Sequence, residues 1–272
     1  MTLALSHTLD AVRKTLNGST CRKERSKIGQ FLTPAGIARF MASLFERKVE
    51  HARILDAGAG AGALFAACVE ELVSRKQKPL SIKVVAYEDD QCILPYLKET
   101  MKQCESVCKA AGILFQGEIR PEDFIAAAIA QTEEGLFSVL EERFSHAILN
   151  PPYKKITEES TARLLLNSAG MEVSNLYAAF VWLSAKMLEP DGELVAITPR
   201  SFCNGPYFRR FRMAFLEMMS MRHIHVFESR KKAFGDDDVL QENIIYHAVR
   251  GNKKPNRLTI SSSEEADFDK VG

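Results

Sequence analysis

Residues 145–153, SHAILNPPY, form the stretch that decides the fold of this 272-residue chain. Its first five residues make a short apolar run of the kind found in strands. Two consecutive prolines can neither extend a helix nor donate hydrogen bonds to a sheet, so the strand ends before them. Asn150-Pro151-Pro152-Tyr153 therefore follows the carboxyl end of a strand, which is the edge where an open α/β sheet binds ligands.

The chemistry of this tetrapeptide suits a planar group that carries an NH2. Two trans prolines fix the backbone so that the Asn150 side chain and the Pro151 carbonyl can face one point, with the Tyr153 ring beside them. These groups provide two hydrogen-bond acceptors and an aromatic wall. A rigid loop, in which Asn150 caps a turn and Tyr153 packs, is the alternative, and the upstream residues bear on the choice.

A strand, a glycine turn and a helix are predicted at residues 53–64, RILDAGAGAGAL. Gly58 and Gly60 let the backbone turn tightly and let a ligand approach, because neither carries a Cβ. Glu88 closes the next predicted strand, residues 82–87, where a carboxylate can bind ribose hydroxyls. The same pattern fits a dinucleotide fingerprint, so it does not separate NAD from other adenosine cofactors.

Asp123 and Phe124 follow a predicted third strand, residues 113–116. There they can bind an adenine amino group and cover its ring, although a favourable charge at a helix N-terminus explains Asp123 equally well. Farther along, the spacing of apolar residues predicts a helix at 176–188, and a fifth strand is expected at 193–198.

Upstream of the glycine turn, Thr33 has the features of an N-cap and Pro34 those of a first helical residue. The free backbone N–H groups of such a helix start can bind a carboxylate. Capping alone also explains the pair, so a ligand role for Thr33 depends on what else lies nearby.

Basic residues are concentrated in two segments. Six lie between Asp10 and Lys27, where a solvated flank is favoured over phosphate contact. Eight lie between residues 200 and 232, interleaved with Phe and Tyr and opposed by two acidic residues, which makes this segment the best candidate for a phosphate-facing surface. An ordinary solvated helix face is the alternative. The eight are Arg200, Arg209, Arg210, Arg212, Arg222, Arg230, Lys231 and Lys232.

The overall composition excludes several classes of protein. With 36 Lys and Arg against 35 Asp and Glu, the net charge is +1, so no global field attracts the chain to nucleic acid. A hydrophobic fraction of 46% is ample for a buried core. No apolar run approaches a membrane span and no signal peptide is evident, which predicts a cytoplasmic protein without membrane contact. The six cysteines form no Cys-x-x-Cys pair, so reduced thiols and no metal site are expected.

In their order along the chain, residues 29–246 resemble the amino-terminal catalytic domain of the adenine-N6 DNA methyltransferases of restriction-modification systems. The arrangement is similar to the gamma class of Eco57I-like and TaqI-like enzymes, in which the Thr-Pro segment precedes the glycine motif. The resemblance implies the S-adenosylmethionine-dependent methyltransferase (Rossmann-like) fold. That fold is one α/β domain with a seven-stranded, mostly parallel sheet, helices on both faces and an antiparallel strand near Asn243.

The resemblance also implies roles for individual residues. At S-adenosylmethionine it places Gln30, Phe31 and Thr33 beside the methionine end, Asp56, Gly58 and Gly60 beneath it, Glu88 at the ribose, and Asp123 with Phe124 at the adenine. At the target base it places Asn150, Pro151, Pro152 and Tyr153, with Phe234 over the other face. The implied partner is double-stranded DNA with one adenine flipped out of the helix, because a stacked base cannot reach such a pocket.

The expected domains are a helical and basic flank at 1–28, a catalytic domain at 29–260 and a polar tail at 261–272. Full-length members of the family carry a separate target-recognition domain, and no room for one is left after Tyr246. The implied further partners are therefore a specificity subunit, a missing carboxyl-terminal region or a cognate endonuclease. Recognition by the chain's own loops is the other possibility.

Other functions stay open on the sequence alone. Asn-Pro-Pro-Tyr also serves methyltransferases that act on a glutamine amide (N5) in a protein, and adenine in RNA is a similar acceptor. A non-catalytic subunit that binds the cofactor or DNA is a further alternative. A dehydrogenase has only the dinucleotide fingerprint in its support. The Thr-Pro segment and the basic, aromatic stretch favour DNA.

Overall fold

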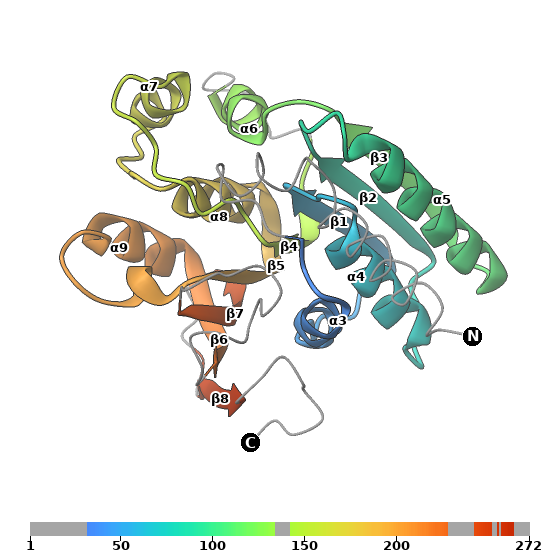
Figure 1. The fold of residues 1–272 in the computed structure, drawn as a ribbon. Coiled ribbons are helices and arrows are strands. Elements are labelled where there is room, and N and C mark those ends of the chain that lie inside the picture. The colour runs from blue at the N-terminus through green and yellow to red at the C-terminus, as the bar shows by residue number, and fades with distance from the viewer. Residues whose placement is uncertain (1–31, 134–141, 228–241, 252–254, 256, 264–272) are drawn as a thin grey trace.

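The computed structural model describes residues 32–133, 142–227, 242–251, 255 and 257–263. Figure 1 shows a twisted sheet with helices on both sides. The helices are α3 (Ala35–Ser43), α4 (Ala63–Ser74), α5 (Leu94–Ala110), α6 (Phe124–Glu133), α7 (Thr161–Ser168), α8 (Leu176–Met187) and α9 (Arg209–Met218), with a short 3-10 helix, η1 (Arg200–Cys203). The strands are β1 (His51–Ala57), β2 (Ser81–Tyr87), β3 (Leu114–Arg120), β4 (Phe144–Leu149), β5 (Leu188–Pro199), β6 (Met219–Phe227), β7 (Asn243–Arg250) and β8 (Thr259–Ser263).

The strands of the described residues form one sheet in the order β3-β2-β1-β4-β5-β7-β6-β8. The first five in this order pair in parallel. β7 is antiparallel to β5 and β6, while β8 is parallel to β6. The mostly parallel sheet and the antiparallel strand near Asn243 are thereby confirmed.

The sheet has one strand more than the seven predicted. The additional strand is β8, which includes residues of the segment expected to be a polar tail. Its serines bind the histidines of β6: the Ser261 hydroxyl lies 2.7 Å from His223 Nε2 and 2.9 Å from His225 Nδ1. Polar side chains are favourable in this edge strand because the neighbouring strand supplies their partners.

The central strands are covered on both faces, and for this reason they appear in the sequence as continuous apolar runs. All six residues of β4 are buried. Ala147 and Leu149 belong to the apolar cluster that includes α8, whereas Ile148 belongs to the cluster that includes α3 and α4. Because side chains alternate along a strand, Asn150 continues this alternation toward the α3 face.

The functional end of the sheet is set by the position of β1 between β2 and β4. The loops that follow these three parallel strands meet at one edge. Gly58, Gly60 and Gly62 all have positive φ angles, of 78°, 54° and 90°. A Cβ at Gly62 would lie 2.6 Å from the Phe65 ring, so the turn into α4 requires glycine there. The predicted strand, glycine turn and helix are confirmed.

The carboxyl end of α3 is fastened to the sheet by Glu193, a buried residue of β5. The Glu193 carboxylate accepts hydrogen bonds from the backbone N–H groups of Glu46 and Arg47, at 3.2 and 3.1 Å. It also lies 3.1 Å from Nε2 of His247 in β7. These contacts bind the segment after α3 to the sheet. The helix begins at Ala35 with Pro34 as its N-cap and without a side-chain cap, so the predicted N-cap role of Thr33 and the predicted first helical position of Pro34 are wrong by one residue.

Residues 1–31, which contain the predicted basic flank, lie outside the described residues. Within the described ranges, no helix has both the length and the apolar composition that a membrane span needs.

Candidate functional site

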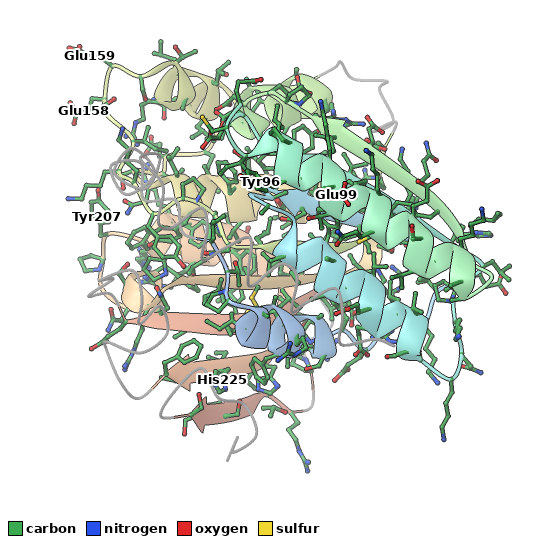
Figure 2. All side chains as sticks on the ribbon, turned by 45° about the vertical axis from the view of Figure 1, so that its right-hand side comes forward. Tyr96, Glu99, Glu158, Glu159, Tyr207 and His225 are labelled. Carbon is green, nitrogen blue, oxygen red and sulfur yellow. The ribbon has the colours of Figure 1, made fainter. Side chains whose placement is uncertain are left out.

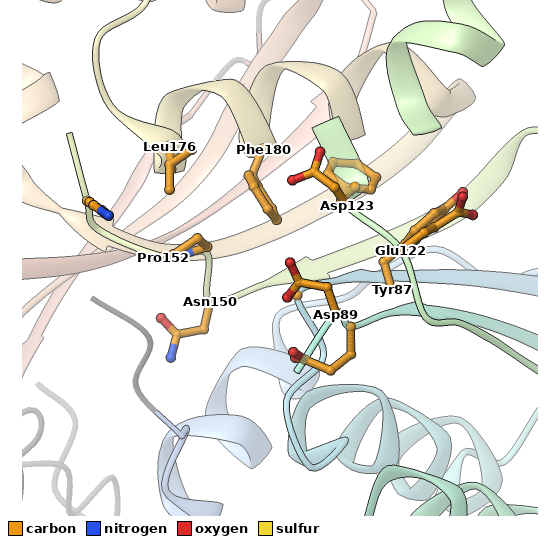
Figure 3. A pocket seen from close by; sticks show the side chains of 12 residues that line it. Tyr87, Asp89, Glu122, Asp123, Asn150, Pro152, Leu176 and Phe180 are labelled. Atoms are coloured by element: carbon orange, nitrogen blue, oxygen red, sulfur yellow. The ribbon is translucent and has the colours of Figure 1, made fainter. Parts of the chain in front are cut away.

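A cavity of about 210 Å³ lies where β1, β2 and β4 end. Figure 3 shows how side chains from the loops and from α8 surround it. Six residues of the predicted site line this cavity: Gly58, Glu88, Asp123, Phe124, Asn150 and Pro152. The structure thus brings together the glycine turn, the end of β2, the start of α6 and the Asn-Pro-Pro-Tyr motif. The other lining residues are Tyr87, Asp89, Glu122, Lys154, Leu176 and Phe180.

Asp56, at the end of β1, is fully buried. Its Oδ2 accepts a hydrogen bond of 3.2 Å from the Phe65 backbone N–H. Its Oδ1 receives no hydrogen bond from any described residue. Burial raises the pKa of Asp56 from 3.8 to about 8. A buried acceptor without a donor among the described residues can accept a hydrogen bond from a group outside them, such as a ligand or a water molecule.

Glu88, at the end of β2, holds the glycine turn. Its Oε2 accepts a hydrogen bond of 2.8 Å from the Gly60 backbone N–H, and its Oε1 accepts one of 2.9 Å from the Asp90 N–H. A carboxylate can accept about four hydrogen bonds, so holding the turn and binding hydroxyl groups are compatible roles.

Three aromatic rings form one wall of the cavity. The centroid of Phe124 lies 5.1 Å from that of Tyr87 and 5.1 Å from that of Phe180. Phe180 also packs over Gly58, where a Cβ would lie 3.5 Å from the ring. This wall is suited to the face of a planar heterocycle.

Asp123 lies beside this wall, and Figure 3 shows its carboxylate near Phe180. Its Oδ1 accepts a hydrogen bond of 2.8 Å from the Ala126 backbone N–H, in the first turn of α6. Asp123 therefore caps the start of α6, as the alternative prediction had it, and it also lines the cavity. Burial and the charges of Asp123 and Asp90 raise the pKa of the neighbouring Asp89.

Asn150 is held from two sides at the rim of the cavity. Its Nδ2 donates to Thr33 Oγ1 at 3.0 Å, and its Oδ1 accepts from the Tyr153 hydroxyl at 3.0 Å. Burial raises the pKa of Tyr153 well above its usual range, so this hydroxyl stays protonated and remains a donor. Two hydrogen bonds therefore fix the Asn150 amide, and one of them links the motif to the Thr-Pro segment.

Sequence reasoning missed several residues that line the cavity. Phe180 and Leu176 follow the apolar spacing of a core helix, and nothing in that spacing distinguishes a cavity wall from packing. Asp89 follows Glu88 and Glu122 precedes Asp123, so adjacency to a predicted site residue was the one signal in the sequence for them. Lys154 likewise follows the Asn-Pro-Pro-Tyr motif directly.

The basic segment makes several contacts with the protein itself. Arg212 donates to the carbonyl oxygens of Phe202, Asn204 and Gly205, at 2.9, 3.0 and 2.6 Å. Arg210 forms an ion pair with Glu172. Arg209, which begins α9, is exposed. Arg200 lies 3.5 Å from Glu242. Their contact with DNA stays a prediction.

A second cavity, of about 450 Å³, lies between the loop that follows Tyr153 and the start of α9. Tyr207 and Glu158 line it and lie near one side of the molecule in Figure 2. Tyr207 is 66% exposed. Arg210 is the predicted DNA-contacting residue that lines this cavity.

Five residues of the predicted site lie outside the described residues: Gln30, Phe31, Phe234, Lys231 and Lys232. In the described part of the chain, no group of three or more His, Cys, Asp or Glu side chains is arranged to hold a metal ion.

Comparison with curated proteins gives matches over nearly the whole chain. It is 42% identical to the type II methyltransferase M.PstI of Providencia stuartii over 261 residues, which is 96% of this chain and 50% of that protein. It is 44% identical to the type II methyltransferase M.BsuBI of Bacillus subtilis over 261 residues, or 94% of this chain and 50% of that protein. The chain thus spans about half the length of these relatives.

Solved structures share the fold at low identity. The type IIG restriction endonuclease BpuSI matches with a TM-score of 0.65 at 15% identity, covering 94% of this chain and 29% of that one. A Listeria monocytogenes protein assigned to the class I S-adenosylmethionine-dependent methyltransferases matches with a TM-score of 0.63 at 13% identity, covering 95% and 74%. The predicted methyltransferase fold is confirmed.

A family model for the Eco57I restriction-modification methylases matches residues 71–234, which is more than half of the chain. This stretch includes β4, the Asn-Pro-Pro-Tyr motif and most of the cavity wall. The chain belongs to the Eco57I restriction-modification methylase family.

Proposed function

We propose that this chain is the catalytic part of a DNA adenine-N6 methyltransferase of a restriction-modification system, with S-adenosylmethionine as cofactor. The observation that carries the proposal is the fixed amide of Asn150 beside a cavity with acidic and aromatic walls. Family membership supports the restriction-modification context. The amide supports an acceptor that carries a planar NH2 group.

Residues that line the cavity, together with Asp56 and the start of α3 outside its lining, fit S-adenosylmethionine. The buried Oδ1 of Asp56, which no described residue satisfies, suits the ammonium group of the methionine end. The backbone N–H groups at the start of α3 suit its carboxylate, because a helix N-terminus attracts negative charge. Glu88 suits the ribose hydroxyls, and the wall of Phe124 and Phe180 suits the adenine. Bound there, the cofactor supplies a methyl group activated by a sulfonium.

The proposed target is the exocyclic amine of adenine. Its nitrogen is a poor nucleophile because the lone pair is delocalised into the ring. When Asn150 Oδ1 and the Pro151 carbonyl accept hydrogen bonds from its two N–H groups, the nitrogen moves toward tetrahedral geometry and the lone pair returns to it. The two acceptors thereby prepare the amine and aim it, and positioning contributes most of the rate enhancement.

DNA is the proposed partner, and the target base must leave the duplex to reach the motif. Flipping costs a few kcal/mol, and stacking on an aromatic side chain returns about 1 to 3 kcal/mol. The second cavity offers the exposed Tyr207 ring for stacking with the flanking strand, whereas Arg210 at the same cavity is paired with Glu172.

The proposal is tested by transfer of radiolabelled methyl groups from S-adenosylmethionine to mixed-sequence duplex DNA, with total RNA and a protein extract as parallel acceptors. Label recovered as N6-methyladenine in DNA is expected. Label in the protein extract would instead assign a glutamine methyltransferase. Cofactor binding without transfer to any acceptor would contradict an active enzyme and favour a non-catalytic subunit.

Replacement of Phe180 by leucine is expected to weaken S-adenosylmethionine binding about three- to tenfold. The substitution keeps an apolar side chain in α8 but removes the ring next to Phe124, and aromatic pairs contribute about 0.5 to 1.5 kcal/mol beyond burial. Isothermal titration calorimetry measures the change. Phe215→Leu is the matched control, because Phe215 is buried in the same apolar cluster without lining the cavity. Equal affinities for the two variants would remove Phe180 from the cofactor site.

A further inference from the structure

A buried hydrogen bond joins the Thr-Pro segment to the catalytic motif, 117 residues later in the chain. The donor is Nδ2 of Asn150 and the acceptor is Oγ1 of Thr33, at 3.0 Å. The two residues are only 8% and 7% exposed. The cofactor contacts proposed for this segment use backbone N–H groups, so they do not account for the Thr33 hydroxyl.

The orientation of the Asn150 amide decides whether it can assist the reaction. A rotation by 180° exchanges its oxygen and its NH2 group with almost no change in shape. In one orientation an acceptor faces the incoming amine. In the other orientation two NH2 groups face each other, and neither can accept. An enzyme of this kind needs a device that selects the first orientation.

The neighbours of Asn150 select that orientation together. The hydroxyl proton of Tyr153 has Asn150 Oδ1 at 3.0 Å and the Ile197 carbonyl at 3.5 Å, so the amide oxygen is its better acceptor. With Oδ1 on the Tyr153 side, Nδ2 lies against Thr33 Oγ1, which accepts from it. In a rotated amide Thr33 would donate to Oδ1, but the Tyr153 proton would be left with the more distant Ile197 carbonyl, so Tyr153 sets the orientation and the Thr33 hydrogen bond holds the amide in it.

The position of the Thr33 hydroxyl is itself fixed. Thr33 immediately precedes Pro34, whose carbonyl accepts the first hydrogen bond of α3, from Ala38. The other end of α3 is bound through Glu46 and Arg47 to Glu193 of the sheet. The acceptor for Nδ2 therefore lies just before a helix whose following segment is hydrogen-bonded to the sheet.

We propose that Thr33 is a positioning residue for methyl transfer, which keeps the Asn150 amide in the orientation that presents its oxygen to the target amine. This proposal rests on the proposed function. The Thr33 side chain acts on the target amine indirectly, by holding the Asn150 amide that binds it. The Thr33 backbone remains available for the cofactor.

The test compares Thr33→Val, which keeps the shape and removes the hydroxyl, with Thr33→Ser, which keeps the hydroxyl. At saturating S-adenosylmethionine, kcat of Thr33→Val for duplex DNA is expected to fall about tenfold to a hundredfold, because the variant loses the buried hydrogen bond between Thr33 Oγ1 and Asn150 Nδ2. Thr33→Ser is expected to restore most of the rate. The Kd for S-adenosylmethionine, measured by calorimetry, should change less than about threefold in both, because both keep the backbone N–H groups.

A second readout does not depend on turnover. The side-chain NH2 protons of Asn150 can be followed in the 15N spectrum of the free protein, assigned by comparison with Asn150→Ala. Their protection from exchange with water should be lost in Thr33→Val and kept in Thr33→Ser. Ser43→Ala is the control on the same helix, since the Ser43 hydroxyl is exposed and donates to the Phe40 carbonyl. It should match the wild type in both experiments.

Several outcomes would overturn the proposal. A wild-type kcat in Thr33→Val would do so, as would an equal loss in Thr33→Ser, because the hydroxyl would then not be the active group. A higher Kd with unchanged kcat at saturation would move Thr33 to cofactor binding alone. If the wild-type chain transfers no methyl to DNA, the proposed function itself fails, and the exchange measurement still decides whether Thr33 holds the amide.

Discussion

Asn150→Ala is expected to lower kcat for DNA methylation by at least about a hundredfold, with S-adenosylmethionine binding changed only a few-fold. The variant removes the side-chain acceptor proposed for the target amine, and loss of one preorganised polar group in an active site typically costs 10²- to 10³-fold. It also leaves Thr33 Oγ1 and the Tyr153 hydroxyl without their shared partner. Single-turnover transfer of labelled methyl groups, together with calorimetry, separates chemistry from cofactor binding.

Asn167→Ala is the matched control for this experiment, because Asn167 is an exposed asparagine of α7. It is expected to behave as the wild type in transfer and in binding. An equal loss of transfer and of cofactor affinity in Asn150→Ala would contradict the assigned role, since the residue would then be part of the cofactor site. Thermal unfolding of each variant shows whether the fold is retained.

Asp56→Asn is expected to weaken S-adenosylmethionine binding about tenfold to a hundredfold at pH 8, because the ionised acceptor proposed for the ammonium group is lost. Hydrogen bonds to charged groups contribute about 1.5 to 3 kcal/mol. The pKa of Asp56 in the free protein is raised to about 8 by burial. The cationic group favours the ionised form, so wild-type affinity should rise by up to about tenfold per pH unit from pH 6 toward pH 8. The variant should show no such rise.

The raised pKa of Asp56 also affects stability: cofactor affinity should rise with pH, whereas the free energy of unfolding should fall. The folded free protein keeps the Asp56 proton up to about pH 8, whereas the unfolded chain loses it near 3.8. The free energy of unfolding therefore contains a contribution that falls as the pH rises through this window and is constant above it. Asp56→Asn should make the free protein more stable than the wild type at pH 8, by on the order of a few kcal/mol, with little difference at pH 4. Urea unfolding at the two pH values measures this. A variant less stable at pH 8 would show that the ionised Asp56 carboxylate supports the free fold.

Local patterns in the sequence were sufficient for the order of the first five strands and for six of the twelve residues that line the cavity. The glycine turn was predictable because alternating glycines permit a tight turn, and in the structure three of them within five residues adopt the positive φ angles that favour glycine. The end of β4 was predictable because two prolines must stop a strand. Glu88 was predictable because it closes a strand of the parallel sheet, whereas the place of Asp56 came from the family resemblance. The eighth strand was missed because its polar serines are satisfied by the histidines of β6, a pairing that local pattern does not contain.

What the sequence by itself determined is therefore the set of loops that meet at one edge, since each depends on interactions within a few residues. The tertiary structure decided which side chains face one another there. It placed Phe180 of α8 against Phe124, although both the wall and an ordinary helix core have the same apolar spacing. It also placed the Thr33 hydroxyl on the Asn150 amide, across 117 residues. The physical reason is that hydrogen bonds and ring contacts across the sheet depend on packing distances of a few ångströms, which only the assembled layers fix.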